Sequence, residues 1–95
     1  MIISQLSIAP IGEGISLSKY VKIALNVLKK NNIKFKTNDM GTVIETKDLE
    51  SLFQAVKQAH EAVIKSGAKR VITELKIDDR QDKNVRLGTK IKSVQ

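Results

Sequence analysis

The side chains that could act as acids, bases or nucleophiles are few and scattered along this chain. His60 is the single histidine, cysteine is absent, and serine, histidine and aspartate do not form the set that a hydrolytic triad needs. Asp78, Asp79 and Asp82 could chelate a divalent cation, but basic residues stand among them, and a solvated turn explains this cluster better. We therefore expect a protein that is not an enzyme and that holds no metal or cofactor.

A second group of polar residues suits ligand binding better than catalysis. Ser7 lies on the polar side of a strand-like run, where it faces either solvent or a ligand. Ser16 or Ser18 is predicted to cap the helix-like run after the glycine-rich loop 12–14, and backbone amides point outward at such a helix start. Two serines and Tyr20 gathered there could hold a ligand. The loop lacks the third glycine and the lysine of nucleotide-binding motifs, so it is a weak phosphate site.

The segment that organises the rest of the chain is residues 33–46. Apolar and polar residues alternate over 33–37 and again over 42–46, on either side of the sequence Asn38-Asp39-Met40-Gly41. Alternating runs around a short Asn/Asp/Gly cluster are typical of two strands joined by a tight turn. The pattern therefore predicts a β-hairpin.

A strand and a helix are predicted on each side of this hairpin. Residues 2–11 alternate as a strand does, and a helical pattern follows as far as about Lys30. After the hairpin, Asp48 is placed to cap a second helix that Gly67 ends, and residues 69–78 alternate again. This order predicts an α+β, ferredoxin-like βαββαβ sandwich with two helices on one face of an antiparallel sheet.

The predicted core consists of one apolar face from each of these helices and outer strands. On the helices we expect it to contain Leu17, Tyr20, Val21, Ala24, Val27 and Leu28, then Leu49, Leu52, Phe53, Val56, Ala59 and Val63. On the strands we expect Ile2, Ser4, Leu6 and Ile8, then Val71, Thr73, Leu75 and Ile77. His60 falls at the margin of the second helical face, as a packed structural histidine does.

Composition limits the remaining possibilities. Ninety-five residues with 41% hydrophobic content support one domain with one modest core. The net charge of +7 is spread along the chain, and only three aromatic residues occur, two of them in predicted helices, so nucleic-acid binding is disfavoured. Neither a signal peptide nor an apolar run of membrane-spanning length is evident, so we expect a cytoplasmic protein that does not contact membranes.

The end of the chain carries more apolar residues than a βαββαβ domain needs. We assign the domain to residues 1–82 and treat residues 83–95 as a separate tail. Val85, Leu87, Thr89 and Ile91 recur at period two within it. This spacing predicts an extra strand along a sheet edge, in the same subunit or in a neighbouring one, where it would serve as an oligomer contact.

Several short segments, taken together, resemble one known family. They are Ser18-Lys19-Tyr20-Val21 after the glycine loop, Met40 to Glu45, Ala59 to Ala62, and Lys69 to Arg80. As an ordered set they are similar to the thiamine-binding protein family, whose members have a YkoF-like, ferredoxin-like fold. The resemblance implies binding of thiamine or a related pyrimidine compound without turnover. It also implies a homo-oligomer, namely a tetramer built as a dimer of dimers through its sheets.

The resemblance implies a pocket at the hairpin, to which Thr42 and Glu45 are the closest matches. Thiamine is a permanent cation, so a protein of net charge +7 must supply a local carboxylate, and Glu45 and Glu74 are the strand acids available. The hydroxyls of Thr42 and Thr46 could serve the aminopyrimidine, and Met40 or Tyr20 could cover a ring face. Alternatively, Glu45 forms a surface ion pair with a nearby lysine: Lys34, Lys36 or Lys47.

Two positions bordering this predicted pocket depart from the family pattern. Asp39 stands where a proline commonly precedes the Met-Gly-Thr run, and Thr46 stands where a glycine usually follows the glutamate. A different function class also fits the predicted fold: a regulatory, amino-acid-sensing domain. Such a domain would hold an anionic carboxylate at the start of the first helix, and Glu45 would be dispensable. RNA binding is a third alternative, and it would require a continuous basic surface.

Overall fold

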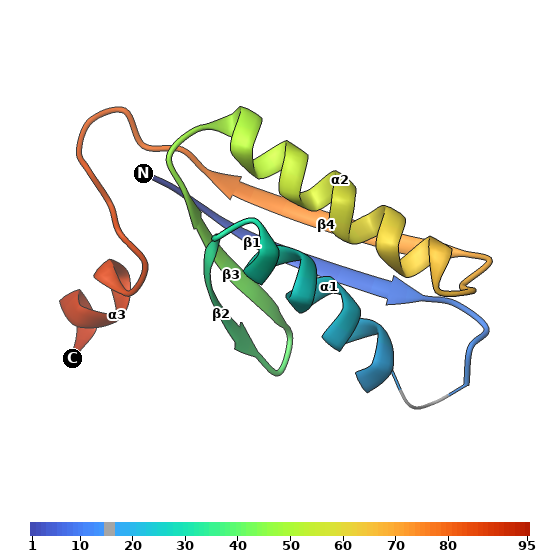
Figure 1. The fold of residues 1–95 in the computed structure, drawn as a ribbon. Helices are drawn as coiled ribbons and strands as arrows, with labels where there is room; N and C mark the ends of the chain where they lie inside the picture. Colours follow the sequence, from blue (N-terminus) through green and yellow to red (C-terminus); the bar gives the residue numbers. More distant parts are fainter. Residues whose placement is uncertain (15–16) are drawn as a thin grey trace.

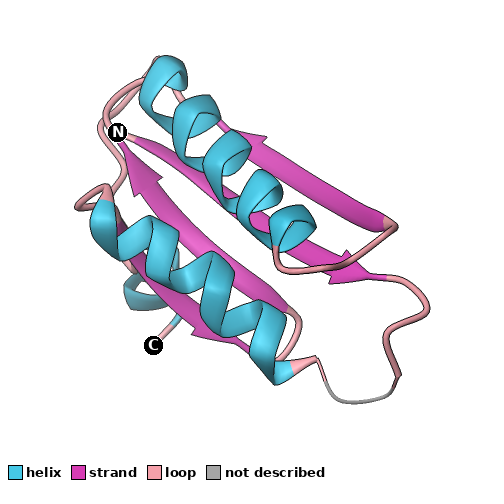
Figure 2. Ribbon diagram, turned by 45° about the vertical axis from the view of Figure 1, so that its right-hand side comes forward, coloured by secondary structure: helices cyan, strands magenta, loops and turns pink. Residues whose placement is uncertain are grey.

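The computed structural model describes residues 1–14 and 17–95, and it has the predicted βαββαβ order (Figure 1). The elements are β1 (Ile2–Pro10), α1 (Ser18–Lys30), β2 (Lys34–Asn38), β3 (Gly41–Thr46), α2 (Leu49–Lys65), β4 (Val71–Asp78) and α3 (Thr89–Val94). The strands form one antiparallel sheet in the order β2-β3-β1-β4. Helices α1 and α2 lie side by side on one face of this sheet (Figure 2), so the predicted ferredoxin-like class is confirmed.

The hairpin of β2 and β3 forms as predicted, with pairs running from Lys34 opposite Glu45 to Asn38 opposite Gly41. Its tip lies tightly against β1. A Cβ atom on Gly41 would lie 3.2 Å from the carbonyl oxygen of Leu6 and 3.3 Å from a side-chain carbon of Gln5. Glycine at this position therefore allows the tip to approach the neighbouring strand closely.

The two long helices differ in how they begin. The Asp48 carboxylate accepts a 2.7 Å hydrogen bond from the backbone amide of Ser51, so the predicted cap of α2 is confirmed. At α1, Ser18 is the first helical residue and Leu17 occupies the cap position, without a side-chain cap. The prediction that Ser18 caps this helix was therefore wrong. Ser16, the other candidate cap, lies outside the described residues.

The core lies between the two helices and the sheet. Its largest fully buried side chains are Leu28, Ile44, Leu52 and Val63. The predicted faces are correct at their centres and wrong at some margins, where the exposed residues are Val21 (38%), Leu49 (39%), Phe53 (50%) and Ile77 (37%). These residues stay exposed because the contact between two helices and a four-stranded sheet buries a narrower face of each element than the apolar periodicity predicts.

The single histidine links the helical layer to the sheet. Nδ1 of His60 lies 2.6 Å from the Thr73 hydroxyl of β4, in a partly buried contact. This contact accounts for its place at the margin of the α2 core face. The structural interpretation of His60 therefore fits the geometry.

The C-terminal segment differs from the prediction. No strand forms in residues 83–95 of the described chain; a loop leads to α3 instead. Gly88 has a left-handed φ of 90°, and the Thr89 hydroxyl accepts a 2.9 Å hydrogen bond from the Arg86 amide. The predicted extra strand does not form in this subunit, where Val85 is buried and Leu87 and Ile91 line a hollow beside the sheet. A contact with a neighbouring subunit stays a prediction. No helix in the described part of the chain is long and apolar enough to cross a membrane.

Candidate functional site

The sheet separates the predicted hairpin residues onto two faces. Because side chains alternate along a strand, Thr42 and Thr46 share the helix-covered face with Ile44, whereas Glu45 shares the opposite face with Val43. We call this opposite side the open face. The expectation that both threonine hydroxyls lie beside Glu45 in one pocket is therefore not met at Thr42.

A groove of about 240 Å³ lies at the hairpin tip on the helix side of the sheet. The groove exists because β1 extends beyond the end of its pairing with β3. Strand β1 pairs with β4 as far as Pro10 but with β3 only as far as Leu6. The edge of β1 beyond Leu6, the tip of the hairpin and the first turns of α1 surround the resulting gap. Its lining includes Ser7, Leu17, Val21, Leu25, Thr37, Asn38, Asp39, Met40 and Thr42.

We call this hollow the tip groove. It brings together Ser7, Met40 and Thr42, three of the residues that the sequence singles out. The hydroxyls of Thr37 and Thr42 lie 3.3 Å apart within hydrogen-bonding distance. Asp39 adds a carboxylate, and none of the described residues lining the groove is lysine or arginine.

The tip groove therefore has features that suit a polar ring with a positive charge. Its deep side is apolar, its hairpin side offers hydroxyls, and its one ionisable lining group in the described chain is an acid. The Met40 side chain is 86% exposed at the rim. A flexible thioether at this position can fold over a bound ring.

Ser18 and Tyr20 lie outside the tip groove. Ser18 is exposed at the start of α1. Tyr20 is buried in a cluster with Ala24, Ala59 and Val63, and its hydroxyl donates a 2.8 Å hydrogen bond to the Glu13 carboxylate. That hydrogen bond is the main reason that the pKa of Tyr20 is raised. The tyrosine ring therefore packs between helices.

Glu45 is buried and has partners in the C-terminal segment. Its carboxylate accepts hydrogen bonds from Nε of Arg86 at 2.8 Å, from the second guanidinium nitrogen at 3.2 Å and from the amide of Leu87 at 2.9 Å. The Arg86 hydrogen bond is the largest cause that lowers the pKa of Glu45 to about 2; the Leu87 amide contributes in the same direction and burial opposes both. The alternative considered for Glu45, an ion pair with a lysine, is therefore replaced by an ion pair with Arg86.

Thr46 lies at the far end of the hairpin from the tip groove. Its hydroxyl is buried and has no hydrogen-bond partner among the described residues. Thr46 and Glu45 both border a hollow of about 460 Å³ at this end, together with Asn31, Lys34 and Lys47. Two lysines in its lining make this hollow less suitable for a cation than the tip groove.

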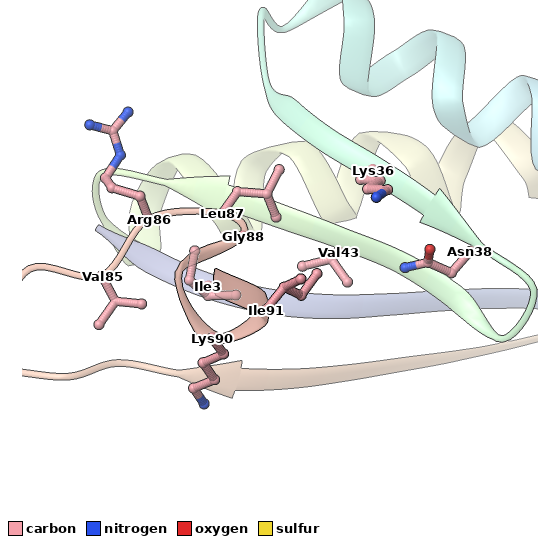
Figure 3. A pocket seen from close by; sticks show the side chains of 10 residues that line it. All are labelled: Ile3, Lys36, Asn38, Val43, Val85, Arg86, Leu87, Gly88, Lys90 and Ile91. Atoms are coloured by element: carbon pink, nitrogen blue, oxygen red, sulfur yellow. The ribbon is translucent and has the colours of Figure 1, made fainter. Parts of the chain in front are cut away.

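A third hollow, of about 450 Å³, lies on the open face under the C-terminal segment (Figure 3). We call it the open-face cavity. Ile3 and Val43 form its floor, and Val85, Leu87 and Ile91 approach from the segment above. This cavity was not predicted from the sequence, although the apolar residues of the tail were the signal that could have indicated it.

The sequence matches the thiamine-binding protein family over residues 4–95. A UPF0045 protein of Methanothermobacter thermautotrophicus is 47% identical over 96 residues, which span 100% of this chain and 97% of that relative. The chain therefore belongs to the thiamine-binding protein family, as the motifs indicated.

Solved structures agree with this assignment. A hypothetical protein of Methanocaldococcus jannaschii has a TM-score of 0.90 and 44% identity, covering 98% of this chain and 94% of that one. A protein of Thermotoga maritima, provisionally assigned to thiamine biosynthesis or salvage, has a TM-score of 0.84 with 99% and 98% coverage. Its identity is 18%, so this likeness supports the fold alone.

Proposed function

We propose that this protein binds thiamine or a related heterocyclic cation in the tip groove and does not turn it over. One observation carries the proposal: the groove combines a carboxylate and two hydroxyls with an apolar wall, and no basic residue lines it within the described chain. A protein of net charge +7 repels a cation except where a local acid offsets its field. Membership of the thiamine-binding family supports the choice of ligand.

Each lining group has a distinct part in this proposal. The Asp39 carboxylate faces the positive charge of the ligand. The hydroxyls of Thr37 and Thr42 hydrogen-bond the polar edge of the ring, and Met40 covers its face. Asp39 occupies the position at which the family pattern commonly has proline, so the charge contact is a property of this chain.

Glu45 has a different role in the proposal. Its carboxylate already binds Arg86 and the Leu87 amide, and a cation would have to displace both. We therefore place the ligand away from Glu45, which keeps a structural role in anchoring the C-terminal segment. This assignment makes Asp39 and Glu45 a matched pair of acids for testing.

Isothermal titration of thiamine into the wild type, Asp39→Asn and Glu45→Gln tests the proposal. We expect Asp39→Asn to weaken binding about fivefold, because a partly exposed charge contact contributes up to about 1 kcal/mol. We expect Glu45→Gln to leave the affinity unchanged. If Glu45→Gln abolishes binding while Asp39→Asn has no effect, the cation site lies at Glu45 and the tip groove is wrong.

The same samples test assembly. We propose that the protein forms a homotetramer, as the family resemblance implies, and works in the cytoplasm. Exposed apolar residues offer contacts, among them Phe53 on α2 (50% exposed) and Ile72 on β4 (43%). Size-exclusion light scattering gives the mass, and a monomer at working concentration would contradict the tetramer.

A further inference from the structure

The open-face cavity contrasts in composition with the tip groove. Its floor is Ile3 of β1 and Val43 of β3, and Leu87 and Ile91 close it from the C-terminal segment (Figure 3). A hollow of about 450 Å³ lies within the range of small-molecule sites. The apolar lining therefore offers room for a ring or a short hydrocarbon chain.

The C-terminal segment above the floor is fastened at three places, the first of which is a 2.8 Å hydrogen bond from the Met1 amino group to the side-chain oxygen of Asn84. Glu45 binds Arg86 and the Leu87 amide at one end of the cavity, and Nζ of Lys90 donates a 2.6 Å hydrogen bond to Asp78 on β4. These contacts give the cavity a defined roof. They also neutralise the Arg86 and Lys90 charges, and both side chains point away from the apolar centre (Figure 3).

Lys36 is the remaining basic residue in the lining. It lies on β2 opposite Val43, with Asn38 two residues along the same strand. No carboxylate of the described chain lies within ion-pair distance of Lys36, in contrast to Arg86 and Lys90. The lining therefore has one uncompensated positive charge beside an apolar space.

We propose that the open-face cavity is a second ligand site, which takes a small amphipathic anion: an aromatic or aliphatic group bearing one acidic group. The apolar part lies between Val43 and Ile91, and the acidic group meets Lys36. Asn38 can donate a further hydrogen bond from its amide. This preference is opposite in charge to that proposed for the tip groove, so the two sites need not compete.

Two fluorescent probes that differ in one charge test this site. Anilinonaphthalene sulfonate has an apolar ring system and a sulfonate, and N-phenylnaphthylamine has the same rings without it. We expect the sulfonate to bind the wild type about fivefold more tightly than the neutral probe, since an exposed charge contact contributes up to about 1 kcal/mol. Equal affinities, or no binding of either probe, would overturn the proposal.

Three variants locate the binding. Lys36→Gln should remove the preference for the sulfonate, whereas Lys76→Gln, on the same face but outside the cavity lining, should keep it. Val43→Phe should fill the cavity and weaken both probes at least tenfold, with circular dichroism confirming the fold. Unchanged preference in Lys36→Gln, or unchanged binding in Val43→Phe, would place the probes elsewhere and contradict the proposal.

The test is independent of the thiamine site. Saturating thiamine should not displace the sulfonate probe, and Asp39→Asn should bind both probes as the wild type does. Displacement by thiamine would show that one site takes both ligands, which would overturn the second site. Loss of thiamine binding with probe binding intact would instead contradict the tip groove alone.

Discussion

The tip groove and the open-face cavity lie on opposite sides of one sheet and draw on the same hairpin. On the helix side, Thr37 and Thr42 contribute hydroxyls to a groove that contains an acid. The residues next to these threonines face the open side. Lys36 contributes a base there, and Val43 contributes an apolar floor. The period of two along a strand thus lets one short segment supply two hollows, for which we propose ligands of opposite charge.

The largest effect is expected from releasing the C-terminal segment. Glu45→Ala leaves Arg86 and the Leu87 amide without their shared acceptor. We expect the free energy of unfolding to fall by about 2 kcal/mol, because hydrogen bonds to a charged group contribute about that much. The sulfonate probe should lose at least tenfold in affinity, since the cavity loses its roof.

Limited proteolysis measures the release directly. Trypsin should cut at Lys83, Arg86 and Lys90 much faster in Glu45→Ala than in the wild type. Thiamine binding, measured by titration, serves as the control and should not change. A resistant segment in this variant would show that other contacts hold the C-terminus.

Acid pH should have the same effect as this substitution. The pKa of Glu45 is lowered from 4.5 to about 2 in the folded protein, so the folded state favours the carboxylate. The contribution to stability is therefore complete above about pH 4.5 and is lost as the pH falls towards 2. Pepsin cleavage of the C-terminal segment should rise across this window in the wild type and change less in Glu45→Gln.

A smaller effect is expected from removing one hydroxyl in the tip groove. Thr42→Val keeps the shape of the buried side chain and removes the hydroxyl that meets Thr37. We expect thiamine affinity to fall about fivefold, because a hydrogen bond contributes about 1 kcal/mol. Probe binding in the open-face cavity should stay the same, and a loss there instead would show that the two faces are coupled.

The smallest effect is expected at Ser4, which is buried on the helix side. Its hydroxyl has no hydrogen-bond partner among the described residues. Replacing it by alanine removes this unsatisfied group, so the melting temperature should rise by a few degrees, about 5 °C for each kcal/mol gained. Neither ligand affinity should change. A lower melting temperature would mean that the hydroxyl makes a stabilising contact.

Local patterns predicted the fold better than the sites. The hairpin and the Asp48 cap depend on residues within a few positions of one another, so the sequence was sufficient to predict them. Strand alternation also contained the information that Thr42 and Glu45 face opposite ways. The partner of Glu45 could not be predicted, because Arg86 lies 41 residues away and comes from a segment whose spacing resembles a strand.

Only part of the tip groove could be predicted from the sequence. Met40 and Thr42 were visible in the hairpin pattern, whereas the gap beside Ser7 results from the unequal lengths of β1 and β3 pairing. No local sequence pattern shows where one strand extends beyond the end of the strand paired with it. The groove therefore becomes apparent only when the register of the sheet is known.

The close approach of Gly41 to Leu6 has a consequence for how a ligand would associate. With the hairpin tip fixed against β1, the hydroxyls at the turn hold their positions before any ligand arrives. A preorganised site loses little conformational entropy when a ligand binds, so more of the contact energy appears as affinity. For the ligand that we propose, differences in affinity among variants of the groove should therefore appear mainly in the residence time, which the groove contacts set.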